Sequence, residues 1–343
     1  MFYHKYLKYK TKYLQLKNQQ NGGGNTPKTY YVNMGEIDKD PKIEKLILDE
    51  LEKRDYVEGK EAPYNFIFVA HDAALQKNRF NTKKSTWINI VDGESKKIIT
   101  NKVKLHKNFQ NYDFLKKAFF IEPDTDINKL EIENKQMILK PSKGFKGYGV
   151  KIVENKKEVK DWLEKNPDYK EWLLQEYIID PDLVDGYKFH LRVLILIITK
   201  ANKELSVYVS NRKLYVKALE KYKKGDWQNE KIHDTHFQES IKMELFNERL
   251  PDNWTNQDRD NANKEINNSI REIFSGQKDF IPEWNSKNGF EVLGADIMFE
   301  NKKPIILEIN SRMGWGSRKI EVIPGLMELI LDNQKTDEFI RII

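Results

Sequence analysis

The stretch GADIMFENKKPIILEIN, residues 294–310, consists of two apolar segments separated by the polar sequence ENKK. If the chain turns near Lys302, Asp296 and Glu308 are equally far from the turn and lie opposite each other on paired strands. Asn310 follows two residues later and therefore shares their face. The opposite face is expected to carry apolar side chains that pack on a core, namely Ile297, Phe299, Ile305, Leu307 and Ile309.

Two carboxylates held about 5 Å apart on such a hairpin repel each other unless they share a proton or a cation. Ligands that are all oxygens favour magnesium, which binds one or two carboxylates and takes further oxygens from water and phosphate. The alternative is a pair of exposed edge residues that align by chance. Because the apolar neighbours indicate burial, we expect Asp296, Glu308 and Asn310 to form a metal site.

A second stretch, MILKPSKGFKGYGV at residues 137–150, places three glycines and two lysines after a strand that ends in a lysine. The spacing of Gly144, Gly147 and Gly149 matches neither the dinucleotide-binding fingerprint nor the Walker loop. The β-branched sequence GVKIV follows the glycines, so they are expected to form the tip of a hairpin. Protein kinases place a similar hairpin over ATP, but their catalytic-loop and Asp-Phe-Gly motifs are absent from this sequence.

Lys143 and Lys146 lie within this glycine tip, and Lys140 ends the strand before it. Backbone N–H groups and lysines at such a tip can bind phosphates. A solvated basic turn would have the same sequence, and taken alone the stretch favours that interpretation. The metal site predicted at Asp296, Glu308 and Asn310 changes this preference to a phosphate-binding loop, because it supplies the cation that such a loop needs opposite it.

The composition of the 343-residue chain indicates a folded protein, since 39% of its residues are apolar. Its net charge of +6 suits an acidic partner, but the dense basic blocks of a nucleic-acid-binding protein are missing. Without cysteine, disulfides, thiolate zinc sites and cysteine nucleophiles are excluded. The longest apolar run, Val193 to Ile198, is too short to span a membrane, and no signal peptide is apparent. We therefore expect a soluble protein of the cytoplasm.

The first 35 residues contain no acid, and the basic repeat KYLKYKTKYLQLK leads into NQQNGGGNTP, which is typical of a flexible linker. Residues 1–27 are therefore predicted to form a tail outside the fold. This tail is either a solvated segment or a short basic helix that binds an acidic or membrane partner. It also resembles a leader that recurs in proteins of giant DNA viruses, which would place the protein in a host cytoplasm.

The strand that ends at Lys140, its glycine hairpin and the later Asp296 and Glu308-x-Asn310 together resemble the ATP-grasp fold. Three further segments are similar to the tubulin–tyrosine ligase family of protein amino-acid ligases. They are LLQEYIIDPDLVDGYKFHLRVLILI from Leu173, LYVKALEKY from Leu214 and FEVLGADIMFENKKPIILEIN from Phe290.

This resemblance covers Lys104 to Asn310 and is thin between Glu220 and Gly289. It implies an α+β fold of the ATP-grasp class, in which the nucleotide lies between two α+β subdomains. These subdomains are expected at residues 104–185, which carry the glycine hairpin, and at residues 186–343, which carry the metal site. A small α/β domain over residues 28–103 would precede them.

The resemblance also implies roles for individual residues. Lys140 would hold the α- and β-phosphates, and the tip from Lys143 to Gly149 would close over the γ-phosphate, with ATP and Mg²⁺ as cofactors. The metal ligands would be the three residues of the hairpin, while Arg192 would face the reacting carboxylate and Lys217 the incoming amino acid. The remaining nucleotide contacts would come from a hinge strand and nearby side chains: Gln175, Glu176, Tyr177 and Ile178, with Lys188, His190, His233 and Thr235.

In the reaction that this family implies, ATP phosphorylates a protein carboxylate and the amino group of a free amino acid displaces the phosphate, forming an amide. Catalysis then needs positioning and charge neutralisation but no side-chain nucleophile. The acceptor would be an acidic protein such as the tubulin C-terminal tail, and the amino acid tyrosine, glutamate or glycine. Two alternatives stay open. One is an ATP-grasp ligase for a small molecule or another protein, and the other is a catalytically weak module that binds microtubules or acidic proteins.

Several positions depart from the family pattern. His190 stands where the motif KFDLR has an aspartate, and Lys217 stands where a second arginine grips the amino acid. HDTH at residues 233–236 matches the family's HLTN only at His233 and Thr235. These departures leave the strength of nucleotide binding and the identity of the amino acid open.

Overall fold

The structure is a computed structural model, and it describes most of the chain. The predicted basic tail, apart from Pro27, lies outside the described residues, as do Lys146 and Gly147 of the glycine tip. The described residues are 27–33, 41–60, 63–69, 82–91, 93–132, 135–144, 148–201, 204–235, 244–277, 288–311 and 321–343.

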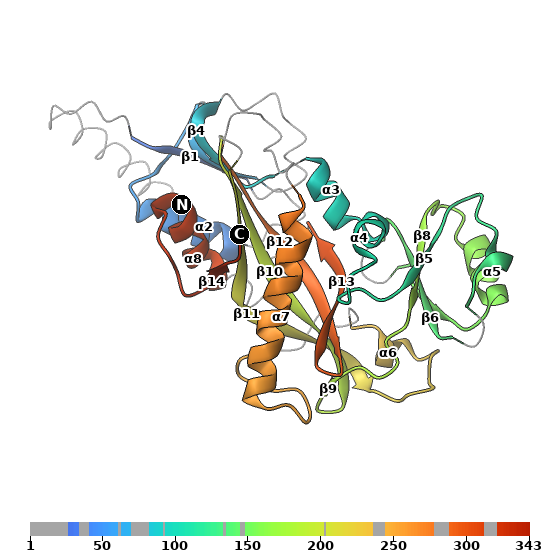
Figure 1. Cartoon of the computed structure of the whole chain (residues 1–343). Coiled ribbons are helices and arrows are strands. Elements are labelled where there is room, and N and C mark those ends of the chain that lie inside the picture. Colours follow the sequence, from blue (N-terminus) through green and yellow to red (C-terminus); the bar gives the residue numbers. More distant parts are fainter. Residues whose placement is uncertain are drawn as a thin grey trace, which may run out of the picture.

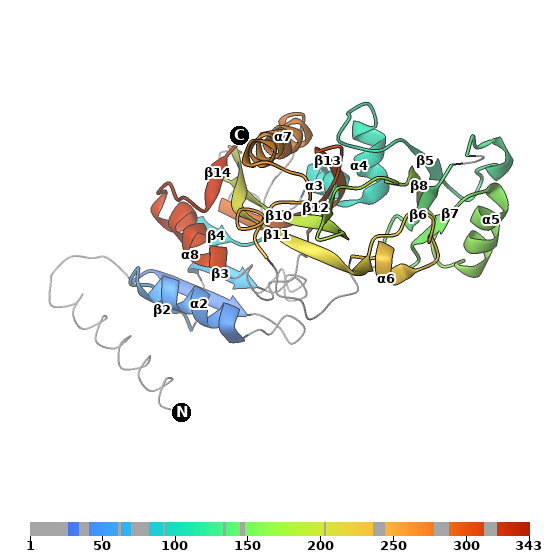
Figure 2. The same cartoon turned by 90° about the horizontal axis from the view of Figure 1, so that it is seen from below.

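Two β-sheets organise the fold, and Figures 1 and 2 show them side by side. The larger sheet contains ten of the described strands: β1 (Thr29–Asn33), β2 (Val57–Glu58), β3 (Tyr64–Val69), β4 (Thr82–Ile88), β9 (Leu183–Val184), β10 (Tyr187–Thr199), β11 (Leu205–Lys221), β12 (Asn288–Glu300), β13 (Lys303–Asn310) and β14 (Phe339–Arg341). Their order is β14-β11-β10-β12-β4-β3-β1-β2, with β13 added to β12 and β9 added to β10.

The smaller sheet carries the glycine hairpin predicted from the sequence. Its strands are β5 (Ala118–Ile121), β6 (Met137–Pro141), β7 (Lys151–Val153) and β8 (Trp172–Glu176), in the order β5-β8-β6-β7. Strands β6 and β7 are antiparallel, with Met137 opposite Val153, so the glycines do join two strands.

Helices cover both sheets (Figure 1). They are α2 (Pro41–Glu52), α3 (Glu94–Thr100), α4 (Lys102–Phe109), α5 (Lys156–Lys165), α6 (Glu230–His233), α7 (Asn256–Ser275) and α8 (Ile323–Met327), with a 3-10 turn η3 (Ile127–Lys129) and a π-helical turn η5 (Glu328–Asp332). None of the described helices combines the length and the apolar character needed to cross a bilayer.

The central strand β10 is apolar on both faces because it has a helix layer on each side. Val193, Ile195 and Ile197 belong to the core cluster that includes the buried face of α7. Leu194 and Leu196 alternate with them and pack in the cluster of α2 and α8. Towards its beginning the same strand stops being apolar on one face, and there it carries the polar residues of the candidate site.

The hairpin of β12 and β13 confirms the predicted pairing of Asp296 with Glu308. It differs from the prediction in which residues of β13 share a face with Ile297. A register shift between Asp296 and Ile297 makes Ile297 pair with Ile306, where an unbroken ladder would pair it with Leu307. Such a bulge adds one residue to one strand and changes the face of the residues that follow. The predicted face of Ile305 and Leu307 is therefore wrong: Ile305 is buried with Ile178 and Met298 in a separate cluster, against which Leu307 packs, and Ile306 packs in the main core.

The N-terminal strand–helix–strand unit is present, with β1 parallel to β3 and α2 between them in sequence. Strand β4 continues this arrangement because it pairs with β3 on one side and with β12 on the other. The larger sheet thus joins strands from the N-terminal and C-terminal parts of the chain. The domain boundaries drawn from the sequence stay predictions.

Candidate active site

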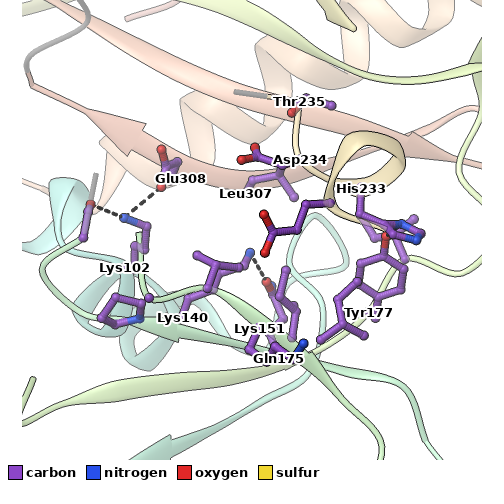
Figure 3. Close-up of a pocket in the computed structure, with 18 of the residues that line it drawn as sticks. Lys102, Lys140, Lys151, Gln175, Tyr177, His233, Asp234, Thr235, Leu307 and Glu308 are labelled. Atoms are coloured by element: carbon purple, nitrogen blue, oxygen red, sulfur yellow. Dashed lines mark hydrogen bonds and ion pairs between the residues drawn. The ribbon is translucent and has the colours of Figure 1, made fainter. Parts of the chain in front are cut away.

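A cavity of about 460 Å³ is lined by residues of the smaller sheet on one side and of β10, β12, β13 and α6 on the other. This volume lies in the usual range of sites for small molecules. Figure 3 shows the side chains that point into it. Many residues predicted as nucleotide or metal contacts are among those lining it: Lys140, Gly144, Gly149, Gln175, Glu176, Tyr177, Ile178, Lys188, His233, Thr235, Asp296 and Glu308.

Lys140 is held at the cavity by a neighbouring strand. It is the last residue but one of β6 and only 9% exposed, and its Nζ donates a hydrogen bond to Gln175 Oε1 on β8 at 2.8 Å. Burial lowers the pKa of Lys140 to about 8, although Glu308 acts in the opposite direction. A lysine that is buried without a carboxylate in contact is costly to fold, so Lys140 is a candidate for binding an anionic ligand.

Lys188 on β10 is a second buried cation at the same cavity. Its amine donates to the hydroxyl of Tyr177 and also lies 4.2 Å from the centre of that ring. Tyr177 Oη lies 2.6 Å from His233 Nδ1, and His233 Nε2 lies 2.8 Å from the carbonyl oxygen of Asp226. Burial, together with the charge of Lys140, lowers the pKa of Lys188 to about 7.

The three predicted metal ligands lie together, and two of them, Asp296 and Glu308, line the cavity, whereas Asn310 is not among its described lining residues. Asn310 Nδ2 donates to Glu308 Oε1 at 2.7 Å and lies 3.4 Å from Asp296 Oδ2. Lys102 Nζ lies 2.9 Å from Glu308 Oε2 (Figure 3). Burial alone would raise the pKa of Glu308, but Lys102 and the Asn310 amide hold that pKa below its usual value.

These residues fit a magnesium ion by the chemistry of their donor atoms. Two carboxylates and one amide offer oxygens, and phosphate and water are needed to complete a magnesium shell. Within the described ranges, no three acidic, cysteine or histidine side chains lie close enough together to hold a metal ion by themselves. The arrangement therefore suits a metal that arrives together with phosphate groups.

Arg192 and His190 both contact Asp296, which is fully buried. Arg192 donates to both carboxylate oxygens, with Nη2 3.0 Å from Oδ2. His190 Nε2 lies 3.4 Å from Oδ1, and its Nδ1 lies 2.6 Å from Thr235 Oγ1. The imidazole of His190 thus connects the β12–β13 hairpin to the loop after α6. Neither Arg192 nor His190 is among the described residues that line the cavity.

The structure explains why glycine occupies two positions of the glycine tip, Gly144 and Gly149. Gly149 has φ +76°, which glycine adopts without strain. A Cβ atom on Gly144 would come within 2.8 Å of the Pro141 ring. The tip is anchored at both ends, since Lys102 Nζ donates to the Gly144 carbonyl at 3.0 Å and Trp162 Nε1 to the Gly149 carbonyl at 2.9 Å. Lys143 is exposed and does not line the cavity.

Lys217 lies apart from the other predicted site residues. It pairs with Phe189 in the β10–β11 ladder and therefore shares the face of Phe189, opposite to that of His190 and Arg192. Its Nζ lies 3.4 Å from Glu244 and 3.8 Å from Asp185. The structure does not bring Lys217 to the cavity.

Several residues of the cavity were missed in the sequence analysis. Met298 could have been found, because it lies two residues after Asp296 on the same strand and so shares its face. Lys102 gave no such signal, since it precedes the glycine tip by more than 40 residues and reaches Glu308 only in the folded chain. Other lining residues that were missed include Lys151, Trp162, Trp227, Gln228, Glu230, Asp234 and Leu307.

Comparisons with known proteins show which family the chain resembles. Residues 71–312, well over half of the chain, match the sequence model described as the tubulin-tyrosine ligase family. Tubulin polyglutamylase TTLL7 of Homo sapiens is 28% identical over 225 residues, which cover 55% of this chain and 24% of the human protein. The probable alpha-tubulin polyglutamylase Ttll1 of Tetrahymena thermophila is 25% identical over 265 residues, covering 67% of this chain and 63% of that protein. The chain thus spans about a quarter of the length of the human relative.

A solved structure is similar over almost the whole chain. The C-terminal domain of Pby1 from K. lactis, an ATP-grasp enzyme, has a TM-score of 0.63 and 16% sequence identity. The match covers 92% of this chain and 99% of that domain. The predicted α+β fold of the ATP-grasp class is thereby confirmed.

Proposed function

The chain belongs to the tubulin-tyrosine ligase family, and on that premise we propose that it is an ATP- and magnesium-dependent protein ligase. It would join the amino group of a free amino acid to a carboxylate of an acidic protein. The observation that carries this proposal is that two buried lysines, Lys140 and Lys188, line the same cavity as the carboxylates of Asp296 and Glu308.

Each side of the cavity has a proposed task. Lys140, Lys188 and Lys102 would bind the phosphates, because their charged amines are donors only and they line the cavity with little exposure to solvent. Asp296, Glu308 and Asn310 would hold Mg²⁺, whose chemical contribution when bound is to neutralise phosphate oxygens. The other proposed nucleotide contacts keep their roles where they line the cavity: Gly144, Gly149, the strand from Gln175 to Ile178, His233 and Thr235.

Arg192 is proposed to contribute to catalysis through Asp296, because Arg192 itself is not among the described residues that line the cavity. Its guanidinium binds Asp296 with two nitrogens, so it fixes the direction of that carboxylate. A cation at this place would also stabilise negative charge on a reacting acyl group. Lys217, on the other face of β11, is not part of the proposed site.

The proposed reaction balances without a protein nucleophile. An oxygen of the acceptor carboxylate forms a bond to the terminal phosphorus of ATP, and ADP leaves. The amine nitrogen of the amino acid then bonds to the acyl carbon, phosphate leaves, and the nitrogen loses a proton to water. The chain's residues bind, orient and neutralise charge in both steps, which is the usual way phosphoryl transfer is catalysed.

The acceptor is proposed from the relatives, whose names describe them as acting on tubulin. A net charge of +6 suits an acidic tubulin tail. Such an acceptor would place the protein in the cytoplasm. Tyrosine, glutamate and glycine are the amino acids to test first.

The test measures ADP release and label incorporation with magnesium, ATP, tubulin and each of the twenty amino acids in turn. Glu308→Gln removes one proposed metal ligand and is expected to abolish both signals. Glu300→Gln is the matched control, since Glu300 lies in the same hairpin and pairs with Lys116 away from the cavity. Equal ADP release by wild type and Glu308→Gln would refute the ligase. Pelleting with microtubules without turnover would instead indicate a binding module.

A further inference from the structure

A buried imidazole that the sequence analysis did not single out contacts the side chain that holds Lys140. His106 on α4 is 1% exposed. Its Nε2 lies 2.7 Å from Gln175 Nε2, and its Nδ1 lies 3.0 Å from the carbonyl oxygen of Lys102. Gln175 Oε1 accepts a hydrogen bond from Lys140 Nζ. One continuous chain of hydrogen bonds thus runs from the backbone of α4 to the cavity.

A single assignment of donors and acceptors satisfies this chain. The amine of Lys140 can only donate, so the amide oxygen of Gln175 faces it. The amide nitrogen of Gln175 then faces His106, and Nε2 must accept because that nitrogen only donates. The Nδ1–H group donates to the Lys102 carbonyl. His106 is therefore neutral, in agreement with burial, which lowers its pKa to about 4.

The His106 imidazole restricts the Gln175 side-chain amide to one of its two orientations. The two ends of a side-chain amide have almost the same shape, so the group can be reversed by half a rotation. Reversal would turn the NH₂ group of Gln175 towards Lys140 and set two donors against each other. It would also set the amide oxygen against the accepting Nε2 of His106. The neutral imidazole therefore opposes the reversed orientation.

The second buried lysine is held in the same way, which indicates that the arrangement serves the lysines. Lys188 donates to the Tyr177 hydroxyl, and that hydroxyl donates to His233 Nδ1. His233 Nε2–H donates to the backbone carbonyl of Asp226. Burial, with the charge of Lys188, lowers the pKa of His233 to about 4. In both chains the lysine donates to an intermediate side chain, and that side chain donates to a neutral histidine. The histidine in turn donates to a backbone carbonyl.

We propose that His106 is a positioning residue for nucleotide binding, which fixes the orientation of the Gln175 amide and thereby the place of Lys140 Nζ in the cavity. This inference rests on the proposed function, because it assumes that Lys140 binds the nucleotide. It adds to that function a residue that touches neither substrate nor metal.

The test compares two amide variants that differ in the atom they keep. In His106→Asn the side chain reaches only as far as Nδ1, so it can donate to Lys102 but offers no acceptor at the place of Nε2. In His106→Gln the amide oxygen reaches that place and can accept from Gln175. Affinity for ADP with magnesium is measured by titration calorimetry. We expect about tenfold weaker binding for His106→Asn, as is usual when a partner that orients a binding group is lost. For His106→Gln we expect binding within about threefold of wild type.

A third variant, Lys140→Met, separates the inference from the proposed function. If His106 acts through Lys140, adding His106→Asn to Lys140→Met causes no further loss of affinity. Unchanged ADP affinity in Lys140→Met alone would overturn both proposals. If Lys140→Met binds weakly while the two amide variants bind equally, whether well or poorly, only the role of His106 is overturned. Thermal melts show that each variant is folded, and Gln175→Met, with the same expected tenfold loss, replaces His106→Asn if that variant is not.

Discussion

Replacing Lys140 by methionine should weaken nucleotide binding and at the same time stabilise the fold. The fall of its pKa from 10.5 to about 8 corresponds to roughly 3 kcal/mol against the charged form in the folded protein. Methionine fills a similar volume and carries no charge, but it loses the hydrogen bond from the charged amine to Gln175, worth about 2 kcal/mol. The free energy of unfolding at pH 7 is therefore expected to rise by roughly 1 kcal/mol.

The effect on binding has the opposite sign. A hydrogen bond from a charged amine to a phosphate contributes about 1.5 to 3 kcal/mol, so Lys140→Met should weaken ATP binding roughly 10- to 100-fold. The stability gain also has a defined pH range, because the folded-state pKa is lowered. The charge opposes folding below pH 8 and stops doing so as pH rises towards 10.5, so the gain should fade over that range.

Urea denaturation at pH 7 and pH 10 and calorimetry with ATP and magnesium measure the two effects. The control is Lys157→Met, which removes an exposed lysine of α5 and should change neither quantity appreciably. If Lys140→Met binds ATP as well as wild type does, residues 137–150 are an ordinary basic turn and not a phosphate-binding loop. A variant less stable than wild type would refute the reasoning about burial.

Three further predictions concern single residues. Because His106 is neutral when folded, with a pKa of about 4 against 6.5 when unfolded, stability should fall by roughly 2 kcal/mol between pH 7 and pH 5; urea titrations at both pH values should show less of this loss in His106→Gln. Arg192→Met leaves Asp296, which is fully buried, without its guanidinium, and should lower the free energy of unfolding by about 3 kcal/mol; a loss below about 1 kcal/mol in chemical denaturation would contradict this. Thr255→Ala removes the capping box with Asp258 at the start of α7 and should cost about 1 kcal/mol, measured by thermal melts.

The sequence determined those parts of the site that depend on neighbours along the chain. The hairpin of β12 and β13 followed from the polar ENKK between two apolar segments, and the hairpin of β6 and β7 followed from glycines between two β-branched segments. Both are local rules, because strand alternation and tight turns act over a few residues. The resemblance to a family then supplied the residues that no local rule connects, such as Lys140 and Gln175.

Only the tertiary structure decided which side chains meet across strands that are distant in sequence. The bulge after Asp296 moved Leu307 to the cavity side, and the β10–β11 register put Lys217 on the face away from Arg192. His106 contacts Gln175 across 69 residues, and nothing in the local pattern points to it. The physical reason is that alternation has a period of two, so a shift of one residue reverses every face. The register that sets these faces comes from packing of the whole sheet, which no single segment contains.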